Sequence, residues 1–301
     1  MKPNITGFFD YDGASSFQEQ IALAQRNQME YICLRSYNGQ PIIELSDNDL
    51  KKIMLELKTA KLKIAVLDTS IPSYDLYDDK RHADALDEFK YMIKVADRLK
   101  VSHLFFRLPK FNDVIEEYDN INKRLEPYVD AAMKNGKKII LLPVNNYKAN
   151  TYTYLFKKIK SNVLSFAFDP VAIMMNNEST TTAYRLLRTM IGAVMCIDAD
   201  HQNMPKLIGY GKTDIVTIFK KLLRDRYAGF LMVDNRFHTS VFNVEPKKVG
   251  LFKKIFSNDK KKKENEMLDL SKKIFPNEET KNVTIDDILE NQIKVLRIIF
   301  K

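Results

Sequence analysis

Short apolar runs alternate with amphipathic stretches along about the first 245 residues of the chain. Each run is four to eight residues long and rich in Ile, Val, Leu or Phe, which is typical of parallel strands buried on both faces. There are eight of them: ITGFFD, YICLRS, KIAVLDTS, SHLFFRLP, KIILLPVN, LSFAFDP, AVMCIDAD and GFLMVDN. The pattern therefore predicts eight parallel strands.

The stretches between the runs have the spacing of amphipathic helices, for example over residues 17–28, 45–61 and 79–100. Ser46, with Asp49 three residues later, is a suitable helix start, and Gly136 is a suitable helix stop. Eight strands alternating with helices predict an α/β fold, a (β/α)8 TIM barrel. A doubly wound open sheet is the alternative, but it has fewer strands and a Gly-rich first turn that is absent here.

The character of the chain changes after Glu245. An eighth helix is expected between Lys247 and Ile274, and Thr284, with Asp287 three residues on, should begin a last helix with one apolar face. We expect a barrel over residues 1–256 and a C-terminal helical appendage over residues 257–301. The last helix should pack on its own barrel; pairing with another subunit in a homo-oligomer is the alternative.

Charge and cysteine content narrow the functional classes. The net charge is +9, but residues 246–301 hold fourteen Lys or Arg against nine Asp or Glu, including Lys260 to Lys263. A run of this kind is usually solvated, so nucleic acid is not the favoured partner. Cys33 and Cys196 lie in strand-like runs, which indicates buried thiols. We expect a cytoplasmic protein without a membrane span, because no sufficiently long apolar stretch or signal-like start is present.

Two segments resemble the sugar phosphate isomerase/epimerase family of the xylose isomerase-like superfamily. MEYICLRSY is similar to the family's second strand, although Cys33 stands where the family usually has Glu. Residues 197–237 resemble the seventh strand, a G-x-G turn, a helix and the eighth strand. The residues that fit this second pattern are Gly209, Gly211, Asp214, Tyr227, Gly229 and Asp234. The resemblance covers about residues 4–245 and implies a barrel that acts on sugars.

The resemblance also implies a divalent metal held by four side chains at the ends of strands five to eight. The corresponding positions here are Pro143, Asp169, Met195 (Cys196 if the register shifts) and Asp234. Pro and Met are not ligands of the hard oxygen or imidazole type, so no metal is expected at this set. The alternative is a rebuilt divalent site formed by Asp169, Asp234 and His201.

Polar residues follow nearly every predicted strand, where the active sites of such barrels lie. Asp169 and Asp234 are the candidate catalytic acid and base. Arg35 and Arg107 are candidates for gripping a polar ligand, with ion pairs to nearby aspartates as the alternative. The other candidate substrate-binding residues are Asp10, Asp68, Asn145, Asp198 and His201. For each aspartate, capping of its own loop is the competing interpretation.

Three functions are compatible with these features. The first is a sugar or sugar-phosphate isomerase or epimerase whose metal site is remodelled or lost. The second is a non-catalytic barrel that binds a polar metabolite. The third, a nuclease similar to apurinic endonucleases of the same superfamily, is least favoured, because its metal cluster needs many ligands and the chain has four histidines.

Overall fold

Eight parallel strands form one nearly closed barrel, as the hydrophobic runs predict. The computed structural model describes residues 2–11, 15–233, 235–242, 256–278 and 282–301. The strands follow one another around the sheet in the order β1-β2-β5-β6-β7-β8-β9-β12. The ends of the sheet, β1 and β2, meet where the Cys33 N–H donates to the Gly7 carbonyl oxygen at 2.8 Å. The strand bounds are β1 (Asn4–Thr6), β2 (Tyr31–Leu34), β5 (Lys63–Asp68), β6 (His103–Arg107), β7 (Lys138–Leu142), β8 (Leu164–Phe168), β9 (Ile191–Cys196) and β12 (Phe230–Val233).

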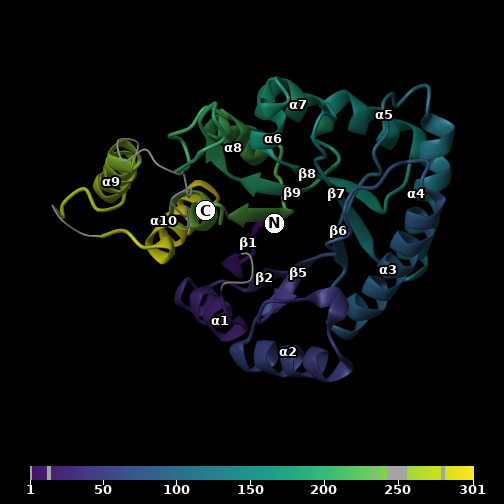
Figure 1. Ribbon diagram of the computed structural model, residues 1–301, viewed down its shortest axis with the longest axis horizontal. Coiled ribbons are helices and arrows are strands. Elements are labelled where there is room, and N and C mark those ends of the chain that lie inside the picture. Colours follow the sequence, from purple (N-terminus) through teal and green to yellow (C-terminus); the bar gives the residue numbers. More distant parts are fainter. Residues whose placement is uncertain (1, 12–14, 234, 243–255, 279–281) are drawn as a thin grey trace.

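Helices surround the strands (Figure 1). The helix bounds are α1 (Phe17–Arg26), α2 (Asp47–Ala60), α3 (Asp79–Arg98), α4 (Tyr118–Lys134), α5 (Ala149–Ile159), α6 (Pro170–Met175), α7 (Thr180–Leu187), α8 (Ile215–Arg224), α9 (Phe256–Ile274) and α10 (Ile285–Ile299). Two small hairpins, β3 (Ser36–Tyr37) with β4 (Gln40–Pro41) and β10 (Asp198–Ala199) with β11 (Pro205–Lys206), follow β2 and β9. A 3-10 turn, η2 (Ile42–Glu44), and a π-helical turn, η3 (His238–Phe242), complete the described elements.

The local sequence fixes the helix ends. Ser46 and Asp49 form the expected capping box at the start of α2, and Thr284 and Asp287 form another at the start of α10. Such a box satisfies two backbone N–H groups that would otherwise lack partners. Gly136, with φ of +61°, follows the last residues of α4, where a side chain would be strained.

The strands separate two apolar layers. Side chains that face the barrel interior form one cluster: Cys33, Ala65, Val66, Phe105, Ile140, Leu142, Ala167, Ala193 and Met232. The alternate positions face outward and join the larger core between the strands and the helices, as Leu34, Leu104 and Cys196 do. Because side chains alternate along a strand, this division determines which residues point into the barrel at its rim.

Helix α10 packs against the barrel wall, in the position of the eighth helix. Its residues Leu289, Ile293 and Leu296 are fully buried in the outer core, and α10 contacts β12. Directly after the C-terminal end of α10, the Phe300 ring packs edge-on against Phe219 of α8, with ring centroids 5.4 Å apart. The helix expected within residues 247–274 is present as α9, but α10, not α9, packs against β12 in this place. The apolar face of α10 is fully buried there.

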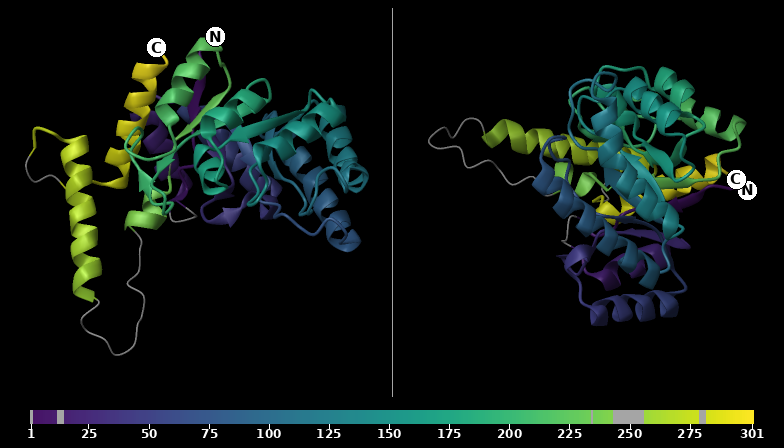
Figure 2. Two further views of the ribbon diagram at one scale, coloured as in Figure 1. Left: turned by 90° about the horizontal axis from the view of Figure 1, so that it is seen from above. Right: turned by 90° about the vertical axis from the view of Figure 1, so that its right-hand side faces the viewer.

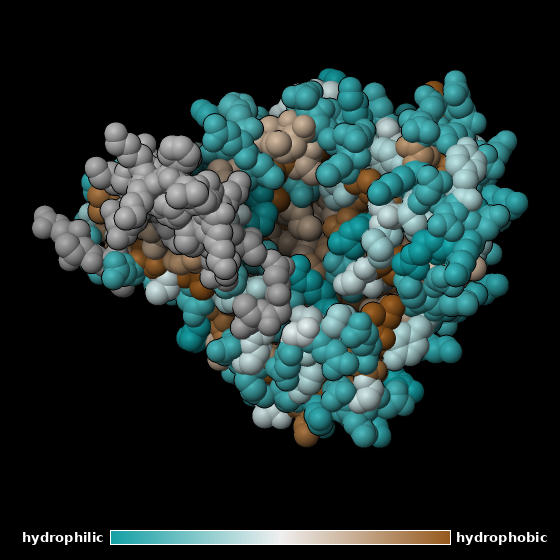
Figure 3. Space-filling view, in the orientation of Figure 1, coloured by the Kyte–Doolittle hydropathy of each residue, from teal (hydrophilic) through white to brown (hydrophobic). Residues whose placement is uncertain are grey.

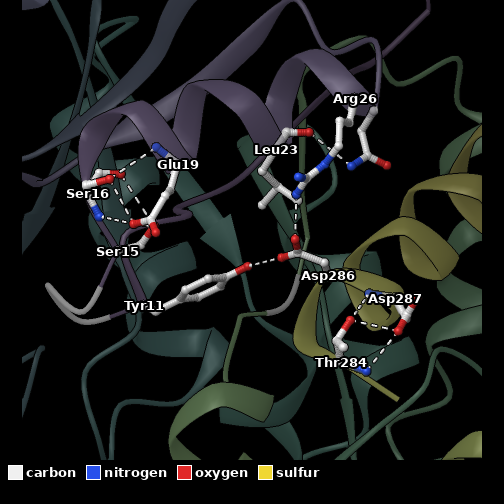
Figure 4. Close-up of polar contacts among 10 residues, drawn as sticks. Tyr11, Ser15, Ser16, Glu19, Leu23, Arg26, Thr284, Asp286 and Asp287 are labelled. Carbon is white, nitrogen blue, oxygen red and sulfur yellow. Dashed lines mark hydrogen bonds and ion pairs between the residues drawn. The ribbon is translucent and has the colours of Figure 1, made fainter. Parts of the chain in front are cut away.

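Polar contacts fix α10 to α1 (Figure 4). Asp286 accepts hydrogen bonds from the Tyr11 hydroxyl and from Arg26, and the Tyr11 ring stacks on His238 with centroids 5.0 Å apart. Near the other end of α10, Arg297 donates to the carbonyl oxygen of Gln28 at 2.9 Å. The last helix is therefore tied to the first at both ends.

Helix α9 lies beside the barrel and extends away from the ring of helices (Figure 2). Its last turns pack against the loop after β11 and the segment after β12: Leu270 is buried with Leu207 and Phe237, and the Lys273 ammonium lies 4.5 Å from the Tyr210 ring centroid. The expected domain boundary at residue 256 adjoins residues 243–255, which are outside the described part. None of the described helices is long and apolar enough to cross a membrane.

Candidate functional site

The carboxyl ends of the eight strands surround a hollow on one face of the molecule. Figure 3 shows this hollow near the centre of the face, with hydrophobic residues in its depth and hydrophilic residues around it. Side chains two residues apart on a strand lie on the same face, so the residue two positions after an interior residue is expected to face this hollow. Arg35 stands two positions after Cys33, Arg107 after Phe105, and Asp169 after Ala167. We call this hollow the mouth of the barrel.

Asp10 and Arg35 form a bidentate ion pair at the ends of β1 and β2. The Arg35 Nε and Nη2 atoms donate to the two carboxylate oxygens of Asp10 at 2.8 and 2.7 Å. The Ser36 hydroxyl donates to the same carboxylate at 2.7 Å. The guanidinium carbon also lies 5.2 Å from the centroid of the Phe8 ring. Asp10 is buried. Arg35 is therefore held by an ion pair with a buried carboxylate and by a cation–π contact with Phe8.

Asp68 and Arg107 form a second pair of the same kind at the ends of β5 and β6. Arg107 Nη1 and Nη2 donate to the two Asp68 carboxylate oxygens at 3.0 and 3.1 Å. The Asp68 side chain is 9 % exposed, whereas that of Arg107 is 31 % exposed. The guanidinium is therefore the member of the pair that is open to a ligand. The sequence left open that both arginines pair with nearby aspartates, and the structure shows these two pairs.

The other side of the mouth is less polar. Asp169 ends β8, and its Oδ1 accepts hydrogen bonds from the backbone N–H groups of Val171 and Ala172 at 2.9 and 2.8 Å, so it caps α6. On the neighbouring strands, Leu142 of β7 belongs to the interior cluster and Met195 of β9 packs against it. One carboxylate thus lies between two apolar positions.

These positions decide whether the metal set implied by the family resemblance fits. On β7 the residue that faces the interior is Leu142, not Pro143, since Leu142 pairs with inward-facing Arg107. On β9 it is Met195, which pairs with Met232, whereas Cys196 faces the outer core. Neither Leu nor Met supplies the oxygen or imidazole donor that a divalent ion of this kind requires. The four-ligand set does not fit these side chains.

The remaining candidates have separate places. Asp198 is buried and accepts from the backbone of Gly209, Gly211 and Thr213 and from the Thr213 hydroxyl, so it organises the loop after β11. Asn145 is exposed in the turn after β7. His201 is exposed in the turn of the β10–β11 hairpin, where Asp200 accepts the turn's N–H groups.

Asp234 lies outside the described residues, so its place at the end of β12 stays a prediction.

Phe8 is a mouth residue that the sequence reasoning missed. It packs against the interior cluster, and its ring centroid lies 6.1 Å from that of Phe105. Its apolar character gave no sign of chemistry. The signal was positional, because Phe8 stands two residues before Asp10 at the end of the first run.

Comparison with known proteins decides the family. The family model described as "Xylose isomerase-like TIM barrel" matches residues 21–248. The chain belongs to this family. No curated protein matches it. The family's fold agrees with the eight-stranded parallel barrel seen here.

Several solved structures share the fold at low sequence identity. D-psicose 3-epimerase with D-tagatose, from Clostridium cellulolyticum H10, is 12 % identical with a TM-score of 0.69, and both chains are covered completely, at 100 %. The probable 3-DHS dehydratase AsbF from Bacillus anthracis is 12 % identical with a TM-score of 0.67 over 98 % of each chain. The IOLI protein with a binding zinc atom is 17 % identical with a TM-score of 0.66 over 91 % of this chain and 99 % of its own.

Proposed function

We propose that this chain binds a small polyhydroxyl molecule, a sugar or a sugar phosphate, in the mouth of the barrel. The observation that carries the proposal is the pair of bidentate contacts Asp10–Arg35 and Asp68–Arg107. They place alternating acceptors and donors along four adjacent strands, β1, β2, β5 and β6. Sugar hydroxyls both donate and accept hydrogen bonds, so such an arrangement suits them.

The structural relatives support the same class of ligand. One of them is a D-psicose 3-epimerase with D-tagatose, and another is a 3-keto-D-glucoside 4-epimerase. In this chain Leu142 and Met195 occupy ligand positions of the implied metal set. We therefore propose that ligand binding here does not depend on a divalent ion.

The test is a screen of free sugars and sugar phosphates by thermal shift, followed by calorimetry. Arg107→Ala should weaken binding of a hit by about 10-fold to 150-fold, corresponding to about 1.5–3 kcal/mol for a hydrogen bond to a charged group. Arg98→Ala is the matched control, because Arg98 pairs with Asp47 on the outer surface and both side chains are more than half exposed. A screen without any hit, or equal affinity in the two variants, would refute the proposed site.

The second candidate is turnover by isomerisation or epimerisation. It is favoured by Asp169, a carboxylate that directly follows β8 between the strands of Leu142 and Met195, together with the prediction that Asp234 lies at the end of β12. A base must reach the proton it removes, and a second acid must return it. Asp169→Asn and Asp234→Asn should then each abolish conversion of a bound sugar. Proton NMR in D2O measures this conversion. A wild-type protein that binds a sugar without converting it supports the binding function instead.

A further inference from the structure

The mouth has two unlike sides. The ion pairs Asp10–Arg35 and Asp68–Arg107 occupy neighbouring strands on one side. On the other side Leu142 and Met195 face inward by strand alternation, and Asp169 follows the strand between them. The depth of the hollow is coloured hydrophobic in Figure 3. Phe8 packs against the apolar interior cluster.

Packing against neighbouring clusters holds the side chains of the apolar side in place. Met195 is half-buried and packs against both the interior cluster and a second small cluster that contains Val171 and Ile197. Leu142, on β7, is 8 % exposed and belongs to the interior cluster. On the side of the ion pairs, Phe8 is half-buried and carries the Arg35 guanidinium 5.2 Å from its ring centroid. A ligand seated between the two sides meets charged donors and acceptors at one edge and the apolar side chains of Leu142 and Met195, on either side of Asp169, at the other.

We infer that the preferred ligand is amphipathic: a sugar or cyclic polyol with hydroxyl groups on one edge and a deoxy carbon or an apolar ring face on the other. This inference rests on the proposed sugar-binding function and narrows it. A hydroxyl placed against the Met195 side chain loses its water without gaining a hydrogen-bond donor from it, whereas a methyl group in the same place buries apolar surface. The mouth thus selects against a fully hydroxylated ligand.

The experiment compares 6-deoxy sugars with their parents by calorimetry: L-rhamnose with L-mannose, L-fucose with L-galactose, and 6-deoxy-D-glucose with D-glucose. We expect the deoxy member of at least one pair to bind about fivefold or more tightly than its parent. Met195→Gln, which offers an amide in place of the thioether, should reduce that ratio to near one. Met175→Gln is the matched control, since Met175 is exposed on α6 outside the mouth.

The outcomes separate the two proposals. Sugars that bind with no preference for any deoxy member, or with a preference that Met195→Gln leaves unchanged, overturn the amphipathic ligand but keep the sugar site. The absence of binding by every sugar and sugar phosphate tested overturns both. The ratio within the wild-type protein is informative by itself, even where Met195→Gln does not fold.

Discussion

At the scale of single residues, the ion pairs at the mouth link the arginines of the proposed ligand site to the stability of the fold. Arg35 and Arg107 are each needed to compensate a buried or nearly buried carboxylate. Removing either arginine leaves a carboxylate without its counter-charge in a poorly solvated place, which is costly. Variants of these residues therefore require a stability measurement beside any binding measurement.

Arg107→Ala should lower the free energy of unfolding by about 2 kcal/mol, below the range for a fully buried pair because the guanidinium is partly exposed. Arg98→Ala should change it by less than about 0.5 kcal/mol, as for exposed pairs. Urea denaturation at pH 7 measures both. Adding Asp68→Asn to Arg107→Ala should recover part of the lost unfolding free energy. Equal losses in Arg107→Ala and Arg98→Ala would contradict this account.

His103 gives a second prediction at this scale. Burial lowers the pKa of its imidazole, Lys138 lowers it further, and the ring lies edge-on to Phe230 at 5.0 Å. The folded state thus disfavours protonation. Its contribution to stability is complete above the ordinary His pKa of about 6.5 and is lost as the pH falls from there toward the lower folded pKa.

His103→Gln should therefore flatten part of the decline in unfolding free energy between pH 7 and pH 5. His82, whose pKa is also lowered by burial, accounts for a further part. The measurement is urea denaturation at several pH values. The control is His201→Gln, which changes an exposed turn residue. A decline of the same steepness in His103→Gln and His201→Gln would show that His103 has no such role.

Sequence alone predicted the residue types at the mouth and offered ion pairs between them, but it did not show which aspartate pairs with which arginine. Arg35 and Arg107 end strands, so their location followed from the hydrophobic runs. Their partners lie 25 and 39 residues away, and the contact depends on which strands are neighbours in the barrel. Asp198 was indistinguishable from Asp68 by position, because only the folded loop shows that it accepts backbone N–H groups.

At the scale of elements, the last helix is part of the barrel wall. Ile293 is fully buried in the outer core, whereas Ile298 on the same helix is 66 % exposed. Ile293→Ala should cost about 2–4 kcal/mol of unfolding free energy, because it removes buried methyl groups and leaves a cavity. Ile298→Ala should cost less than about 0.5 kcal/mol. Thermal and urea denaturation compare the two, and similar costs would argue against the packing of α10.

Helix prediction succeeded where the signal was local. The capping boxes at Ser46 and Thr284 and the helix stop at Gly136 depend on neighbouring residues, and each occurs in the structure. The places of α9 and α10 around the barrel depend on packing with distant residues, such as that of Leu270 with Phe237 and of Phe300 with Phe219. Spacing alone could not decide it, since both segments have helical periodicity.

At the scale of the whole molecule, the order of the strands and the donor types at their ends predict a barrel that binds its ligand without a divalent ion. Protein purified without added metal or chelator should contain well under one equivalent of zinc, manganese or cobalt. Inductively coupled plasma mass spectrometry measures this metal content. Treatment with EDTA should leave both the melting temperature and the affinity for a sugar hit unchanged. A stoichiometric ion, or loss of affinity that added metal restores, would contradict this expectation.

The position of α10 also has a consequence for biosynthesis. The eighth strand is translated about fifty residues before the helix that covers it, with α9 between them. While the ribosome makes those residues, the outer face of β12 lacks the contacts with α10, and exposed apolar surface of this kind favours aggregation. A nascent chain stalled after residue 245 should thus associate with chaperones, and release of the full-length product should end that association.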